Sequence, residues 1–117
     1  MNLLLVAFGG AAGSLLRYGC SRWLNNTFFP FGTLAVNTVG AFLIGLLWAT
    51  FSKQTDEPAR LLLVTGFCGG FTTFSAFSWE GLQMLQQGKF APFFLYTFAT
   101  IVFGLAATYT GYKLIHT

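Results

Sequence analysis

The 117 residues combine 55% hydrophobic and 19% aromatic side chains with only 8% charged ones. An ordinary soluble domain carries about 25% charged residues, so this composition excludes a typical soluble enzyme. The formal net charge of +3 comes from six basic and three acidic residues, and the basic ones are scattered singly along the chain. They form no basic patch that could follow a phosphate backbone, so no nucleic-acid partner is expected.

Four uncharged segments occupy most of the chain, at residues 1–16, 23–52, 61–79 and 90–112. A helix needs about 20 mostly apolar residues to cross a hydrocarbon core about 30 Å thick. Three segments come close to or exceed that length, and the first reaches it by extending past Arg17. The sequence therefore predicts an all-α membrane protein with four transmembrane helices in the lipid bilayer, forming a single domain over residues 1–117.

The first two helices are expected over residues 3–23 and 32–52. Between them lie Asn25, Asn26 and Pro30, which are typical turn residues. The pattern therefore predicts a short turn there.

The third helix follows a charged connection at residues 53–60 and runs to about residue 87. Pro58 is placed near its start, where the missing N–H costs nothing. Gly88 is the expected C-cap, and Pro92 is expected to open a fourth helix that continues to residue 114.

The basic residues divide equally between the two sides of this four-span arrangement. One side carries Lys53, Arg60 and Lys113, and the other carries Arg17, Arg22 and Lys89. The positive-inside rule therefore gives no preferred orientation. Two explanations stay open on charge alone: orientation set by another feature, or copies that insert both ways and pair antiparallel.

The third helix contains an unusual run at residues 66–78, with paired glycines followed by Thr72, Thr73 and Phe74. Paired glycines weaken a helix, and backbone freed at membrane depth can coordinate a cation if it is buried in protein or lines a cavity. The alternative is that Gly66 and Gly70 merely allow close helix packing. The neighbouring hydroxyls favour a break near mid-membrane and an ion site.

Phe74 and Phe77 are three residues apart and so share a helical face. Aromatic side chains are chiefly packing material, and that interpretation stays open here. The edge of an aromatic ring is electropositive, however, and can face an anion without the strong binding of a full charge. A channel needs such weak contacts because an ion must leave as well as enter.

Polar residues of the second and fourth helices are further candidates. Asn37 could join helices by a hydrogen bond or could replace water around an anion. Thr33 lies at the start of its helix, where the positive end of the dipole favours negative charge. Tyr96 and Thr100 are four apart and can form a polar track along one face of the fourth helix.

Only Arg17 and Glu80 are candidates for charge inside the membrane, where it is costly. Both are expected toward helix ends, where water reaches them, which favours an ion vestibule over a deep proton relay. The sequence shows no nucleophile with a base, so it does not predict an enzyme.

Three motifs together resemble the Fluc or CrcB fluoride channels. They are Gly9-Gly10 to Arg17-Tyr18, Gly32-Thr33-Leu34 with Val36-Asn37, and Gly69-Gly70-Phe71-Thr72-Thr73-Phe74-Ser75. The third motif is the most specific, and the order and spacing of all three match the family.

The resemblance implies an antiparallel dual-topology homodimer with two fluoride pores. It also implies a structural Na⁺ at its centre, held by the backbone carbonyls of Gly69 and Thr72 in each subunit. The pore phenylalanines fall on Phe74 and Phe77, and the pore asparagine falls on Asn37.

Arg17 matches the family's vestibule arginine, and Tyr96 and Thr100 match its polar track. Ala76 departs from the family, which often has threonine between the two phenylalanines.

The leading hypothesis is therefore passive export of fluoride through the inner membrane of a bacterium, which protects the cytoplasm. The alternative is a small dual-topology proton-coupled multidrug antiporter. Such antiporters carry a glutamate within the first helix, whereas the first helix here contains no acidic residue.

Overall fold

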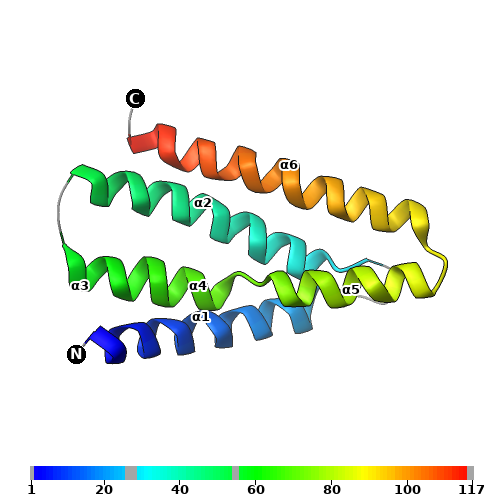
Figure 1. Ribbon diagram of the computed structural model, residues 1–117, viewed down its shortest axis with the longest axis horizontal. Helices are drawn as coiled ribbons and strands as arrows, with labels where there is room; N and C mark the ends of the chain where they lie inside the picture. The colour runs from blue at the N-terminus through cyan, green and yellow to red at the C-terminus, as the bar shows by residue number, and fades with distance from the viewer. Residues whose placement is uncertain (1, 26–28, 54–55, 116–117) are drawn as a thin grey trace.

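The computed structural model describes residues 2–25, 29–53 and 56–115, and these residues form four helical rods (Figure 1). The first, second and fourth rods are single helices, and the third consists of four consecutive helical segments. In chain order the elements are α1 (Asn2–Leu24), α2 (Phe31–Lys53), α3 (Glu57–Arg60), the π-helix η1 (Leu61–Cys68), α4 (Gly69–Phe71), α5 (Phe74–Gln86) and α6 (Phe90–Ile115).

All four rods are long and apolar enough to span a membrane, with lengths of 23, 23, 30 and 26 residues. The predicted all-α architecture with four candidate spans is confirmed. The ends of the first two helices agree with the sequence-based bounds to within a residue. Asn26, predicted in the turn between them, lies outside the described residues.

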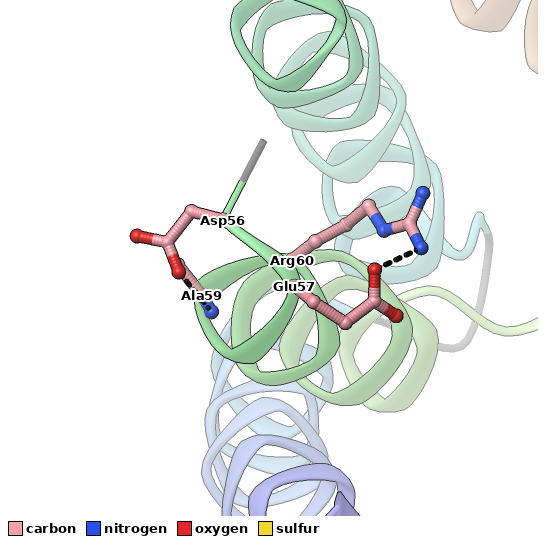
Figure 2. Close-up of polar contacts among 4 residues, drawn as sticks. All are labelled: Asp56, Glu57, Ala59 and Arg60. Atoms are coloured by element: carbon pink, nitrogen blue, oxygen red, sulfur yellow. Dashed lines mark hydrogen bonds and ion pairs between the residues drawn. The ribbon is translucent and has the colours of Figure 1, made fainter. Parts of the chain in front are cut away.

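The third rod begins earlier than the sequence pattern predicted, because residues 57–60 are helical and not part of the connection. Asp56 caps this helix, since its side chain accepts a hydrogen bond from the N–H of Ala59 at 3.2 Å (Figure 2). The negative charge of Glu57 in the first turn is favourable because it lies near the positive end of the helix dipole. Glu57 also forms an ion pair with Arg60 one turn later. Pro58 lies in the first turn, as predicted.

The turn between α5 and α6 confirms Gly88 as the residue that ends the third rod. Gly88 has φ +75°, a left-handed conformation that glycine adopts without strain. The N–H of Lys89 then reaches back to the carbonyl of Met84 at 2.8 Å, which satisfies a terminal carbonyl. Pro92 is in the first turn of α6, which begins at Phe90, two residues before the predicted start.

The rods pack as two pairs that lie side by side (Figure 1). α1 packs against η1 and α4, and α2 packs along α6. The first turns of α1 and α3 and the last turns of α2 and α6 lie at one end of the bundle, whereas α5 ends and α6 begins at the other (Figure 1).

Glycines bring α1 and the third rod into backbone contact. A Cβ on Gly9 would collide with the backbone of Leu62 and Phe67, and a Cβ on Gly13 with the carbonyl of Phe67. Gly70 lies equally close to Gly10. In a membrane, where lipid is as apolar as leucine, such close packing is a main source of helix association. The packing interpretation of the third-rod glycines is therefore confirmed.

A similar contact joins α2 to α6. A Cβ on Gly45 would meet the carbonyl of Thr108, and a Cβ on Gly111 would meet that of Phe42. The Thr108 hydroxyl also donates to the carbonyl of Ala41 at 3.0 Å, which adds an interhelical hydrogen bond. The two helices are thereby held at a fixed depth relative to each other.

We expect Gly13→Ala to destabilise the protein, because the added methyl group meets the Phe67 carbonyl and cannot be relieved by a rotamer change. Overpacking of this kind costs about 1–3 kcal/mol. Gly19→Ala is the matched control on the same helix, since nothing lies within 4 Å of its Cβ position. Thermal unfolding in detergent should show a lower midpoint for Gly13→Ala alone. Equal midpoints for the two variants would contradict the packing argument.

Candidate functional site

The third rod is interrupted between α4 and α5, where two threonines leave the helical conformation (Figure 1). Thr72 has ψ 154° and Thr73 has φ −151°, both in the extended region. The Thr73 hydroxyl accepts a hydrogen bond from the N–H of Ala76 at 3.1 Å and so caps α5. The Thr72 hydroxyl donates to the carbonyl of Cys68 at 2.9 Å. A new helix N-terminus therefore begins within the third rod, at Phe74.

Asn37 of α2 holds this interruption through a reciprocal pair of hydrogen bonds. Its Nδ2 donates to the carbonyl oxygen of Thr73 at 3.1 Å, and its Oδ1 accepts from the N–H of Thr73 at 2.8 Å. One side chain from another helix thus satisfies both backbone groups of Thr73, which a continuous helix would have satisfied internally. Of the two roles that the sequence left open for Asn37, the interhelical one is present.

Arg17 of α1 contacts the other side of the interruption. Its Nε donates to the carbonyl oxygen of Gly70 at 3.1 Å. A cation there also complements the negative end of the helix dipole that α4 terminates. Arg17 lies in the C-terminal third of α1, and its side chain contacts the third rod next to the interruption.

A groove of about 510 Å³ lies beside the interruption, between α2, the start of α5 and α6. Its lining consists of Asn37, Ala41, Ile44, Thr72, Thr73, Phe74, Phe77, Thr97, Thr100, Ile101 and Thr108. Five of the predicted site residues are among them, contributed by three separate helices. Phe74 is 78% exposed, so its ring stands at the open side of the groove.

The aromatic rings continue from the groove into the protein interior. The ring centroids of Phe74 and Phe77 are 5.8 Å apart, and those of Phe77 and Tyr96 are 5.1 Å apart. Tyr96 is fully buried and packs edge-on against Phe29. Phe77 therefore connects the groove to a second group of predicted residues.

That second group surrounds the carboxylate of Glu80. Oε2 accepts hydrogen bonds from the Thr33 hydroxyl at 2.9 Å and from Asn25 Nδ2 at 3.0 Å. Oε1 accepts one from the Tyr96 hydroxyl at 2.9 Å. Thr33, like Tyr96, is fully buried. The charge is thus stabilised by three donors from three other parts of the chain.

The sequence analysis assigned Asn25 only to a turn and missed its part in this cluster. Besides donating to Glu80, Asn25 accepts a hydrogen bond from the N–H of Thr33 at 3.0 Å. It thereby caps α2 from a position outside the helix. No local signal identifies this role, because an N-cap residue directly precedes its helix and Asn25 lies seven residues before the predicted start at Gly32.

The predicted site residues therefore fall in two places. Asn37, Thr72, Phe74, Phe77 and Thr100 line the groove, whereas Thr33, Glu80 and Tyr96 form the carboxylate cluster. Arg17 and Gly69 line neither one. Arg17 borders the interruption on the α1 side, and Gly69 opens α4 just before it.

Four long apolar rods, one of them interrupted beside a groove with hydroxyl and amide groups, define a multi-pass membrane protein. Irregular backbone at membrane depth occurs in transport proteins where it is buried or lines a cavity. Thr72 and Thr73, the two residues of the interruption, also line the groove.

Comparison with known proteins gives the particular family. Residues 4–112 match the family described as CrcB-like protein, Camphor Resistance (CrcB). The chain is 47% identical over 115 residues to the fluoride-specific ion channel FluC of Thermus thermophilus, covering 95% of this chain and 91% of the relative. The fluoride-specific ion channel FluC of Leptospira interrogans is 43% identical over 119 residues, covering 97% of this chain and 94% of the relative. That of Gloeobacter violaceus is 49% identical over 114 residues, covering 93% of this chain and 91% of the relative. The protein belongs to the CrcB-like family.

We expect Asn37→Asp to destabilise the protein at the interruption, although asparagine and aspartate side chains have nearly the same size. The substitution replaces the donor Nδ2 by a carboxylate oxygen that faces the Thr73 carbonyl. Loss of the donor leaves the Thr73 carbonyl oxygen without its partner and facing a negative charge, which lowers the free energy of unfolding by about 1–3 kcal/mol or more. The thermal unfolding midpoint in detergent should fall clearly below that of the wild type. A midpoint equal to the wild-type value would show that the reciprocal pair contributes little to stability.

Proposed function

We propose that this protein is a passive channel that carries fluoride ions out of the cytoplasm through the bacterial inner membrane. The relatives described above are named fluoride-specific ion channels, and the matches cover more than nine-tenths of both chains. The observation that carries the proposal is that Asn37, Phe74 and Phe77 come together in one groove beside the helix interruption. This function requires no catalytic group, and the protein is not proposed to be an enzyme.

The groove offers weak contacts for a small anion. Electropositive ring edges of Phe74 and Phe77 can face fluoride without a full positive charge. The N-terminus of α5 begins at Phe74, and the positive end of its dipole favours negative charge at that point. Asn37, whose Nδ2 keeps a second N–H, and the Phe rings together replace part of the hydration shell. Thr100 adds its hydroxyl only when it releases the Tyr96 carbonyl. Contacts of this strength let an ion enter and still leave.

The groove also supports an antiparallel homodimer as the working unit. Its hydroxyl and amide groups would face lipid in an isolated copy, which a bilayer does not favour. A second copy in the opposite orientation covers the groove and encloses two pores, one on each side of the two-fold axis. Equal numbers of basic residues on the two sides leave both orientations accessible, which is what such a dimer needs.

A structural Na⁺ is proposed at the interruption, held by the carbonyls of Gly69 and Thr72 from each subunit. In a continuous helix these carbonyls would bond the N–H groups of Thr73 and Ala76. Those N–H groups instead donate to Asn37 and to the Thr73 side chain. Carbonyl oxygens are ligands that hard cations prefer, so these two fit the ion.

The carbonyl oxygens of the neighbouring residues already accept hydrogen bonds, so fewer carbonyl oxygens are left to bind Na⁺. Gly70 accepts from Arg17, and Thr73 accepts from Asn37. When bound, Na⁺ would supply positive charge at the dimer centre and fix the two interruptions against each other.

Arg17 and Glu80 are proposed as vestibule residues at two separate places, Arg17 beside the interruption and Glu80 in the carboxylate cluster, where Thr33 and Tyr96 hold its position. The ring contact between Phe77 and Tyr96 joins the groove to that cluster. Because Glu80 is held by three donors, its charge has a fixed position at this end of the path. The rival antiporter mechanism would need an acidic group in α1, which has none.

We expect the purified protein to release fluoride rapidly from liposomes, read with a fluoride electrode, while chloride stays inside parallel vesicles. Protein-free liposomes are the control for leakage. Loss of both ions at equal rates would contradict a fluoride-specific channel. Absence of flux, together with drug accumulation driven by a pH gradient, would support the antiporter.

We expect Phe74→Cys, with both native cysteines replaced by alanine, to form cross-linked dimers on treatment with a short bis-maleimide reagent in membranes. Phe74 is at the interruption and 78% exposed, so the two copies meet near the proposed two-fold axis. Leu3→Cys, 85% exposed near one end of the bundle, is the control. Antiparallel copies place its two thiols at opposite membrane faces, so no product forms. Cross-linking at Leu3→Cys alone would indicate parallel copies.

A further inference from the structure

The polar side chains of the groove already have hydrogen-bond partners, with one exception. Asn37 is engaged with Thr73, and the Thr73 hydroxyl accepts from the N–H of Ala76 and shares a second hydrogen bond, 3.3 Å long, with the Ser75 hydroxyl. The remaining hydroxyls of the lining donate to carbonyl oxygens, those of Thr72 to Cys68, Thr100 to Tyr96 and Thr108 to Ala41. A donor used in this way has no second proton to offer an ion.

The exception is Thr97 of α6. Its Oγ1 is buried, and among the described residues it has no hydrogen-bond partner. Helical threonines commonly bond the carbonyl four residues earlier, and Thr50, Thr100 and Thr110 all do so here. A buried polar group without a partner is destabilising, so its presence calls for a role outside the isolated fold.

We propose that the Thr97 hydroxyl donates a hydrogen bond to the fluoride ion in the groove, as a binding residue of the pore. This inference rests on the proposed function. Thr97 and Phe77 line the same groove, so an ion held at the ring of Phe77 lies on the groove wall that Thr97 shares. Threonine populates two χ1 rotamers in a helix, so the hydroxyl can change direction without a change in the backbone.

Fluoride suits this position better than a larger or weaker acceptor. It is a compact anion, and a hydroxyl that donates to a charged acceptor makes a stronger hydrogen bond than one that donates to a neutral group. Because no competing acceptor holds the Thr97 proton, the ion does not have to displace an existing bond. Thr100, by contrast, would first have to release the Tyr96 carbonyl.

The test compares fluoride efflux from liposomes for the wild type, Thr97→Val, Thr97→Ser and Thr110→Val, each over a range of fluoride concentrations. Valine keeps the shape and removes the hydroxyl, and serine keeps the hydroxyl. Thr110 is an exposed α6 residue outside the groove whose hydroxyl bonds Ala106, so it controls for the loss of a helical hydroxyl.

Thr97→Val should slow fluoride efflux about tenfold or more, as expected for a lost hydrogen bond to a charged group. Thr97→Ser should stay within a few-fold of the wild type, and Thr110→Val should match it. The unfolding midpoint of Thr97→Val should not fall, because a buried hydroxyl without a partner is replaced by a methyl group. Slower flux without lower stability separates ion contact from a structural role.

Wild-type efflux in Thr97→Val would overturn the proposal and leave the channel function standing. Equal losses in Thr97→Val and Thr97→Ser would also overturn it, because packing of the methyl group would then be the cause. A wild-type protein that releases no fluoride would overturn both this inference and the proposed function, so the two failures are distinguishable.

Discussion

The reciprocal pair between Asn37 and Thr73 is the interaction on which the other features of the site depend. It satisfies the backbone of a residue that has left the helix, which lipid could not do. It diverts the N–H that would otherwise bond the Gly69 carbonyl. It also sets the direction in which α5 restarts, with Thr73 as its cap. The exposed position of Phe74 follows from where that new helix begins.

The two hydrogen bonds between Asn37 and Thr73 form only when α2 and the third rod lie at a fixed depth and distance from each other. Glycines at the helix contacts allow this close approach. A Cβ on Gly40 of α2 would meet the Thr72 side chain, so α2 approaches the interruption closely one turn beyond Asn37. On the far side, α1 is held by Gly9 and Gly13 against the wider π-helical turns of η1. The interruption is therefore packed tightly against α2 on one side and α1 on another, and it borders the groove.

The four spans and the weak point of the third rod could be predicted from the sequence. The length of each apolar segment determines the number of spans, and glycines followed by threonines mark where a helix is weakened. Asn37 and Phe77 were singled out for the same reason, as unusual residues for their setting. The partners could not be predicted. That Asn37 bonds the backbone of Thr73, or that Asn25 reaches Glu80, depends on how rods distant in sequence align, and helical periodicity carries no information on that alignment. The π-helical conformation of residues 61–68 likewise has no signal in a uniformly apolar segment.

The polar residues of the carboxylate cluster and those of the groove differ in how firmly their hydrogen bonds are committed, and this difference bears on the channel proposed above. Glu80 is held by three donors, two of them on fully buried residues, so that cluster forms a rigid end to the path. The groove is apolar apart from one amide and several hydroxyls, and of these only the Thr97 hydroxyl has no partner among the described residues. In the proposed channel, the carboxylate of Glu80 contributes a fixed negative charge beyond Phe77, whereas the ring edges in the groove attract an anion only weakly. A pore that binds the ion weakly in its middle and has a rigid cluster at its end allows faster passage than a uniformly polar channel. In a uniformly polar channel each site would retain the ion.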